Sequence, residues 1–574
     1  MGLIDDVLND LDEGFVGLFA QWNFWTTLLA TAIIGIITYQ FATHKEPDIH
    51  PFILYRQSER SAVRLPGESP EYRSPSAPFG QLTSGLNVKD PGTPRWAKGR
   101  DGDLRDIWRQ VLAGVQPEDA SGSVQGPTGR ILTVLGTEKV IEHKLDDITR
   151  QINLIGQHIA TNKGDRVAIY LPNSVELLAT LFACAFYDLA AVILPFDQSE
   201  DVVISMLRRA EVDTVVTAPG VFPFESVVKS YPALRQLIWV VDPGSEHLNW
   251  NDIPQGESQV SVFTWQDIVK ESPQDAGKTL PPLEGQKPPR DITLFWLSQR
   301  PFRDEMVTFT HGNFVSGVAA QLSAIPASQR IDTSDLFLPA DSLANSYTLV
   351  WTLTALYSNA SVAFNSAAAQ AHDLSAALTG VNPTIVVATP LALARWHKQQ
   401  FKNLGYFARR YKVQRMRRWA SIGHMADLKG TGKLRLILTA KRAGVTPGPK
   451  DPVLSTGLLT DLRMWLGARV MYALTAAKVA GAVTQTLYYD YRLFASSRTN
   501  SETHFGPPVT SVVIVLRDTP EYKNSDDVYQ GEIIVRGPAV AGGEAALGEV
   551  GIMREDWTLG SPHGEILHDD DVEN

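Results

Sequence analysis

Cysteine is almost absent from this sequence of 574 residues, which contains one, Cys184. A single thiol excludes a disulfide framework and a cysteine-based metal site. Cys184 lies inside an apolar run, LLATLFACAFYDLAAVIL, so we expect a small buried side chain in a protein that faces a reducing compartment. Net positive charge is lacking as well. The formal charge is −11, so no overall positive field favours nucleic acid as a partner.

Charged residues are missing altogether between Gly14 and Thr43. The apolar part, from Phe24 to Phe41, would be roughly 27 Å long as a helix, close to the hydrocarbon thickness of a bilayer. The sequence therefore predicts one transmembrane helix over residues 23–42. A cleaved signal peptide and a buried core helix are the alternatives.

The residues that flank this run predict its orientation. Residues 1–22 are acidic and contain no Lys or Arg, unlike the basic start of a signal peptide. Basic residues follow the run, at Lys45, Arg56, Arg60 and Arg64. The positive-inside rule then places the short N-terminus in the lumen and the main domain in the cytosol. We expect the endoplasmic reticulum, with the mitochondrial outer membrane or a lipid droplet as alternatives.

The rest of the chain can be divided into segments of different composition. Residues 43–95 are rich in Pro, Ser and Gly and predict a linker, although Phe52, Leu54 and Tyr55 could dock on the main domain. From Asp101 onward, strand-like and helix-like segments alternate, which predicts an α/β fold of βαβ units. A strand-rich stretch near residues 506–542 predicts a β sub-domain.

Several segments carry a resemblance to a known family. They are KGDRVAIYLPNSVELLATLFACAFYDLAAVILPF (163–196), FTHGNF (309–314), NPTIVVATPLALARW (382–396), YALT (472–475) and FGPPVTSVVIVLRDTPEYKNSDDVYQGEIIVRGP (505–538). Together they resemble the large N-terminal domain of the adenylate-forming (AMP-binding) superfamily, and the last is similar to long-chain acyl-CoA synthetases. The resemblance implies two βαβ-type sub-domains plus a β sub-domain over residues 96–574. It also implies an ATP-dependent, Mg²⁺-dependent route through an acyl-adenylate to acyl-CoA.

The phosphate loop departs from the family pattern, Y-T-S-G-T-T-G-x-P-K-G-V-x-x-T-H. Its counterpart is WLSQRPFRDEMVTFTH, residues 296–311, in which Ser298, Val307, Thr310 and His311 match. The glycines are replaced by Gln299, Phe302 and Met306, and the lysine by Glu305. Glycines let backbone N–H groups approach phosphate oxygens, and Glu305 reverses a charge. Arg300 and Arg303 could restore some positive charge, but not the backbone cradle.

The other ATP-contacting motifs are altered too. The Y-G-x-T-E motif keeps Tyr472 and Thr475, but its metal-binding glutamate is Ala476, which has no ligand atom. The adenine segment S-G-G-A is Thr439 to Arg442, and the histidine of L-P-x-A-H is Ser342. No aspartate follows Trp557 at the W-F-x-T-G-D position. We also expect the mobile lid domain, which follows the family's hinge near Asp570–Asp571, to be absent.

A basic cluster adds one membrane-surface candidate. It has no acidic residue and contains Arg409, Arg410, Lys412, Arg415, Arg417 and Arg418. It could lie on an anionic leaflet, or be a solvated face that pairs with acidic surface elsewhere.

These observations predict a membrane-anchored acyl-CoA synthetase-like protein that does not adenylate, with no catalytic residue, metal or cofactor. It would act as a scaffold, a lipid-binding protein or a regulator in lipid metabolism. Its expected partners are membrane lipid, a fatty acid or acyl-CoA, and another acyl-CoA synthetase or membrane protein. The alternatives are an active long-chain fatty acid–CoA ligase with divergent contacts to ATP, Mg²⁺ and CoA, and a plain membrane tether.

Overall fold

The computed structural model divides the chain into two units, residues 1–48 and 49–574, which are described separately. It describes residues 16, 23–43, 46–77, 80–89, 93–94, 96–115, 126–135, 139–241, 260–283, 287–297, 304–365, 374–378, 380–402, 420, 423–425, 433–446, 448, 451–491, 503–524 and 528–561.

The first unit contains helix α2 (Phe24–Thr43), which begins where Asn23 Oδ1 accepts hydrogen bonds from the backbone N–H groups of Trp25 and Thr26, at 3.0 and 3.1 Å. Its large apolar side chains, from Phe24 to Phe41, are all exposed. No helix in the described part of the chain has the length and hydropathy needed to cross a membrane. The transmembrane helix predicted over residues 23–42 is therefore not supported.

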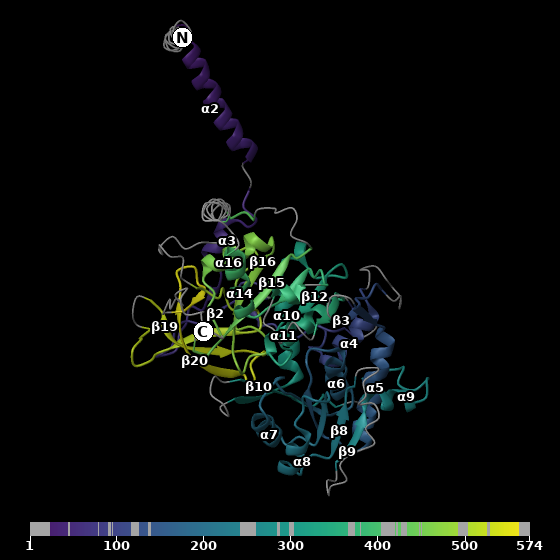
Figure 1. Ribbon diagram of the computed structural model, residues 1–574. Coiled ribbons are helices and arrows are strands. Elements are labelled where there is room, and N and C mark those ends of the chain that lie inside the picture. The colour runs from purple at the N-terminus through teal and green to yellow at the C-terminus, as the bar shows by residue number, and fades with distance from the viewer. Residues whose placement is uncertain are drawn as a thin grey trace. The chain divides into compact units, whose positions relative to one another are not determined.

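The second unit contains a seven-stranded sheet that is parallel except at one edge. Its strand order is β11-β10-β6-β5-β7-β8-β9, and only the β10–β11 pair is antiparallel. The strands are β5 (Arg166–Tyr170), β6 (Ala190–Ile193), β7 (Thr214–Thr217), β8 (Gln236–Trp239), β9 (Ser261–Thr264), β10 (Ile292–Trp296) and β11 (Glu305–Phe309). The accompanying helices are α5 (Leu145–Thr161), α6 (Val175–Phe186), α7 (Glu200–Arg209), α8 (Phe224–Ser230) and α9 (Trp265–Glu271). Figure 1 shows them in the blue to teal part of this unit.

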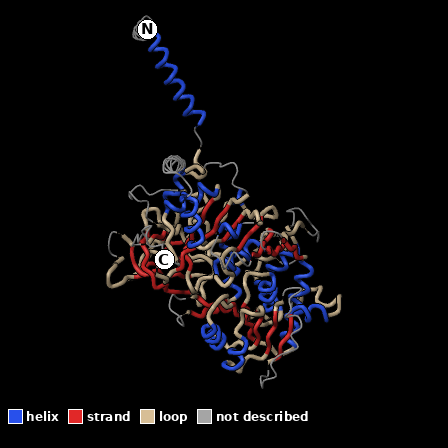
Figure 2. The backbone as a smooth tube through the Cα atoms, viewed as in Figure 1, coloured by secondary structure: helices blue, strands red, loops and turns tan. Residues whose placement is uncertain are grey.

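An eight-stranded sheet forms the second α/β layer, with strand order β17-β16-β15-β14-β12-β13-β3-β4. Its inner strands are parallel, and the edge pairs β16–β17 and β3–β4 are antiparallel. The strands are β3 (Ile131–Leu135), β4 (Lys139–His143), β12 (Leu336–Pro339), β13 (Ser361–Asn365), β14 (Ile385–Val387), β15 (Leu436–Arg442), β16 (Arg469–Thr475) and β17 (Thr484–Gln485). The helices are α4 (Leu104–Ala113), α10 (His311–Ala324), the 3-10 helix η3 (Ala327–Gln329), α11 (Ser346–Tyr357), α13 (Leu374–Leu378), α14 (Pro390–Lys402) and α16 (Thr456–Leu466). These two sheets confirm the predicted pair of βαβ-type sub-domains, and Figure 2 shows helices beside both.

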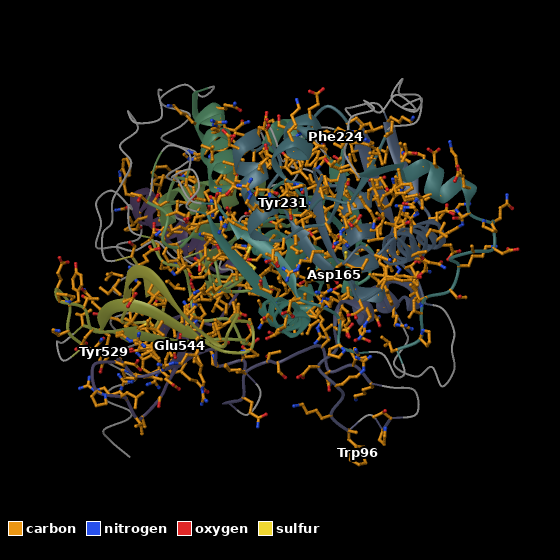
Figure 3. All side chains as sticks on the ribbon, turned by 90° about the horizontal axis from the view of Figure 1, so that it is seen from below. Trp96, Asp165, Phe224, Tyr231, Tyr529 and Glu544 are labelled. Atoms are coloured by element: carbon orange, nitrogen blue, oxygen red, sulfur yellow. The ribbon has the colours of Figure 1, made fainter. Side chains whose placement is uncertain are left out.

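A six-stranded antiparallel sheet forms the predicted β sub-domain, with strand order β1-β2-β18-β19-β20-β21. Its strands are β1 (Glu59–Arg60), β2 (Tyr72–Arg73), β18 (Val513–Arg517), β19 (Gln530–Arg536), β20 (Glu544–Met553) and β21 (Leu559–Gly560). Figure 3 labels Tyr529 and Glu544 here, at the other end of the unit from Phe224 and Tyr231.

Part of the segment that the sequence predicted as a linker belongs to this sheet. Strand β2 pairs with β18, and the short helix α3 (Pro51–Tyr55) precedes β1. Leu54 is buried, but Phe52 and Tyr55 are exposed. Backbone hydrogen bonds from Gln57, Ser69 and Thr83 therefore join this segment to the rest of the unit.

One apolar core runs through all three sheets of the described chain and includes Val167, Leu436 and Ile514. Helix α4 contributes Trp108, whose ring centroid is 5.1 Å from that of Phe182 on α6. Cys184 lies in the same core, 1% exposed, as the sequence predicted. Burial raises the pKa of its thiol to about 12, so the side chain acts as a small hydrophobe.

Tyr72→Ala tests whether the β1–β2 segment is part of the domain. Tyr72 is 1% exposed and pairs with Ile514, so truncation should cost about 3–5 kcal/mol and speed hydrogen exchange of the β18 amides. Tyr55→Ala is the matched control, because Tyr55 is 78% exposed and its loss should cost less than about 0.5 kcal/mol. Equal exchange rates in both variants would show that residues 59–73 are a loosely attached linker.

Candidate functional site

The counterpart of the phosphate loop is a β-hairpin. Strands β10 and β11 are antiparallel, and Trp296 at the end of one pairs with Glu305 at the start of the other. The predicted site residues Ser298, Gln299 and Phe302 lie between them, outside the described residues. Met306 is part of β11 and 37% exposed.

Thr310 ends the hairpin and caps helix α10. Its hydroxyl accepts a hydrogen bond from Asn313 N at 3.2 Å, and Asn313 Oδ1 accepts one from Thr310 N at 2.9 Å, which is a capping box. Asn313 Nδ2 also donates to the carbonyl oxygens of Pro538 and Val540, at 2.8 and 3.2 Å. The matched residue Thr310 therefore caps α10, and its capping partner Asn313 joins the start of α10 to Pro538 and Val540.

Glu305 stands where the family has its loop lysine, and it forms an ion pair with Lys478. Glu305 Oε1 lies 3.5 Å from Lys478 Nζ, and the two side chains are 46% and 49% exposed. Lys478 comes two residues after Ala476, so a basic residue follows the position of the lost metal-binding carboxylate. The pair joins the hairpin to the segment after β16.

Tyr472, Thr475 and Ala476 are all buried at the β16 end. The Tyr472 hydroxyl accepts a hydrogen bond from Leu454 N at 3.2 Å, and burial raises the pKa of this phenol. Thr475 Oγ1 donates to the Lys441 carbonyl oxygen at 3.0 Å. The two residues retained from the family motif therefore satisfy backbone groups, and Ala476 supplies no metal ligand.

Strand β15 ends in two basic residues where the family has glycine and alanine. The Lys441 ammonium pairs with the Glu549 carboxylate of β20, and these side chains are 7% and 18% exposed. Glu549 Oε2 also accepts a hydrogen bond from Gly444 N at 3.2 Å. Sequence reasoning missed Glu549, because no local pattern connects two residues so far apart in the chain.

Arg442 lies against the hairpin. Its guanidinium carbon is 4.5 Å from the centroid of the Trp296 ring, and the guanidinium donates to the Leu297 carbonyl oxygen. Burial lowers the pKa of Arg442, while the nearby carboxylates of Asp451, Asp341 and Asp304 act in the opposite direction. Residues with long side chains therefore stand beside the hairpin at positions where the family has small ones.

Ser342 replaces the histidine of the L-P-x-A-H segment, and its neighbour Asp341 helps to position the start of α11. The Asp341 carboxylate accepts hydrogen bonds from Ser342 N, Asn345 Nδ2 and Thr348 Oγ1, at 2.7 to 3.0 Å. Ser342 Oγ accepts one from Ala344 N at 3.2 Å. The Asp341 and Ser342 side chains therefore bond to groups of this turn and of the first residues of α11.

His311 matches the family pattern but is an interior side chain. It is 6% exposed, and its Nε2 lies 3.0 Å from the Arg290 carbonyl oxygen. Burial lowers the pKa of His311 to about 4, although the charge of Asp103 opposes this shift. Its imidazole is therefore neutral near pH 7. No group of three or more His, Cys, Asp or Glu side chains suited to a metal ion occurs in the part of the chain that the structure describes.

Trp557 packs against the N-terminal part of the same unit. The Arg56 guanidinium carbon lies 3.8 Å from the centroid of the Trp557 ring, and Thr558 Oγ1 donates to Asp556 Oδ1 at 2.8 Å. The hinge candidates Asp570 and Asp571 lie outside the described residues. The same is true of the whole basic cluster, Arg409, Arg410, Lys412, Arg415, Arg417 and Arg418.

Comparison with known proteins agrees with this fold. A family model described as "AMP-binding enzyme" matches residues 147–290 and 306–543. The unmatched stretch between them, 291–305, contains strand β10 and the hairpin loop. A search of proteins with curated functions found no match.

Solved structures of ligases share the fold. An anthranilate CoA ligase, AuaEII, in complex with anthranoyl-AMP aligns with a TM-score of 0.56 at 15% identity, covering 82% of this chain and 79% of that one. Coronafacic acid ligase from Pectobacterium brasiliense gives 0.54 at 14% identity, covering 80% and 77%. A benzoate CoA ligase from Burkholderia xenovorans gives 0.53 at 12% identity, covering 80% and 79%.

Glu549→Gln tests the ion pair beside the hairpin. It would leave the Lys441 ammonium buried without its countercharge, and we expect a loss of about 3 kcal/mol in unfolding free energy, seen as a lower denaturation midpoint. Glu555→Gln makes the same charge change at an exposed residue and should leave the midpoint unchanged.

Combining Lys441→Met with Glu549→Leu should recover most of that stability, because neither charge is then buried alone. If Glu549→Gln is as stable as Glu555→Gln, the pair does not hold β15 to β20.

Proposed function

Because this chain belongs to the AMP-binding enzyme family, we propose that it is an acyl-CoA synthetase-like protein that no longer adenylates a substrate and acts as a scaffold or regulator in lipid metabolism. One observation carries the proposal. At the positions where the family contacts ATP, the charged side chains are paired with each other, as Glu305 with Lys478 and Lys441 with Glu549.

Electrostatics explains why this arrangement does not suit a triphosphate. Phosphate-binding loops offer backbone N–H groups and a lysine, whereas the hairpin offers the Glu305 carboxylate at the lysine position. With an effective dielectric near 20, a like charge about 4 Å away costs up to roughly 4 kcal/mol. Lys478 could oppose this only by leaving Glu305. The residues present do not fit the nucleotide.

The metal position gives independent support. Mg²⁺ takes oxygen ligands, and Ala476 has none in its side chain. The family model also fails to match residues 291–305, which contain the hairpin loop and Glu305, although it matches the residues on either side, 147–290 and 306–543. Loss of nucleotide contacts within a fold that is otherwise kept is what we expect when the fold serves another purpose.

The alternative is an active fatty acid–CoA ligase with divergent ATP contacts. Its support is the presence of three cations, Lys441, Arg442 and Lys478, around the hairpin. Two of them are already paired with carboxylates, and Arg442 lies on Trp296. We therefore favour the first proposal.

Titration calorimetry separates the two. We expect no saturable heat of binding with ATP·Mg²⁺ up to about 1 mM, which corresponds to a binding free energy weaker than roughly 4 kcal/mol. We also expect no pyrophosphate release when fatty acid and CoA are added with ATP·Mg²⁺. A saturable heat of nucleotide binding in the native chain that is lost in the Lys478→Ala variant would establish the alternative.

Glu305→Lys is the matched control for the charge reversal. It should not restore nucleotide binding, because the new lysine would face Lys478 and the metal ligand would still be missing. Circular dichroism confirms that the variant is folded. Nucleotide-dependent heat from this single change would show that Glu305 alone blocks the site.

We also propose that membrane lipid is the partner of helix α2. The support is its surface: ten large apolar side chains, from Phe24 to Phe41, are exposed around the helix. Burying each of them would gain about 1.5–3 kcal/mol, so water is a poor environment for this helix. Binding of a fatty acid, an acyl-CoA or another synthetase, a lumenal N-terminus and the endoplasmic reticulum stay predictions.

Vesicle flotation tests the lipid partner. The full chain should float with phosphatidylcholine vesicles, and replacing Leu28, Ile33 and Ile37 with serine should shift it to the soluble fraction. Serine in place of Val63, Leu65 and Val528, which are exposed on the main unit, is the control and should change nothing. Failure of the full chain to float would refute the proposal.

A further inference from the structure

Helix α3 is a short element held firmly on the main unit. Pro51 occupies its first turn, and His50 Nδ1 accepts a hydrogen bond from Phe52 N at 3.2 Å. Leu54 points inward and is 8% exposed. The helix is thus fixed at its start by a cap and along its length by a buried side chain.

The residues that follow α3 anchor it further. Gln57 is 1% exposed, its backbone N–H donates to Asp556 O at 2.9 Å, and its Nε2 donates to Asp490 Oδ2 at 3.1 Å. Ser58 Oγ donates to the Trp557 carbonyl oxygen. The exposed side chains of α3 therefore have a fixed position on the main unit.

Helix α3 has only five residues, and its outer side is apolar. Phe52 is 75% exposed, Ile53 50% and Tyr55 78%. Single exposed hydrophobes are normal on soluble proteins, but a cluster that the fold holds in place indicates a contact surface.

We propose that Phe52, Ile53 and Tyr55 form a lipid-contact surface by which the main unit rests in the headgroup region of a bilayer. The inference depends on the proposed association of α2 with lipid. Only seven residues separate Thr43 from Pro51. If α2 is in lipid, this connection keeps α3 within roughly 28 Å of it.

The residue types and charges at α3 favour lipid, rather than water or another protein, as the contact of this surface. Aromatic side chains such as Phe and Tyr are favoured at membrane interfaces, where an apolar body meets polar headgroups. Beside α3, the guanidinium carbons of Arg56 and Arg60 lie 3.8 and 5.4 Å from the Trp557 ring centroid. These cations suit an anionic headgroup layer.

The single native cysteine makes a direct test possible. Cys184 is buried, so a thiol-reactive fluorophore labels a cysteine introduced by Ile53→Cys or, as a second position, Tyr55→Cys. The full chain is bound to phosphatidylcholine and phosphatidylserine vesicles whose acyl chains carry bromine. Val140→Cys is the matched control, because Val140 is 53% exposed on β4, at the far edge of the eight-stranded sheet from β17.

We expect bromine quenching and a blue-shifted emission at positions 53 and 55, and neither at 140. Absence of quenching at 53 and 55 in a chain that floats would overturn the lipid-contact surface while leaving lipid association of α2 intact. Failure to float would refute both. A blue shift without quenching would show that protein covers α3, and equal quenching at 140 would indicate general adsorption. Either result would overturn the inference.

Discussion

The ion pair between Lys441 and Glu549 is the constraint on which the hairpin region depends. It joins the end of β15, in a parallel sheet, to β20 in the antiparallel sheet, and both side chains are largely removed from water. Two buried charges need each other, because separating them leaves an ion without solvent or countercharge. A ligand that required Lys441 would have to compete with Glu549. The same argument applies with less force to the more exposed pair of Glu305 and Lys478.

Much of the fold could be predicted from the sequence, because apolar strands and amphipathic helices have strong local periodicity. The βαβ alternation, the β sub-domain and the burial of Cys184 follow from such patterns. Strands β1 and β2 could not be found in this way, since each has two residues and leaves no periodic signal. Their pairing with β18 arises from contacts between distant parts of the chain. The sequence instead favoured a linker there, because prolines outweighed the short apolar stretches.

The candidate site was predicted in part. Comparison with the family pattern identified Glu305 and Ala476 as positions where a cation and a carboxylate are lost. It did not identify Lys478 or Glu549, the residues that pair with Glu305 and Lys441, because pairing partners are determined by the tertiary fold. Tyr472, Thr475 and Thr310 match the pattern, yet in this structure each serves a backbone group. A residue that matches the family pattern can therefore have a structural role of its own in this fold.

If, as we propose, the site does not bind a charged ligand, it must satisfy its own charges. In an enzyme of this family, bound nucleotide and metal would supply the countercharges for the residues that contact them. Where those ligands do not bind, a lone buried lysine or arginine would be costly. In this chain a carboxylate faces Lys441, another faces Lys478, and the Trp296 ring and a carbonyl oxygen face Arg442. Internal pairing thus keeps the sheets together without a ligand, and this is the physical condition under which such a fold can be retained for a role other than adenylation.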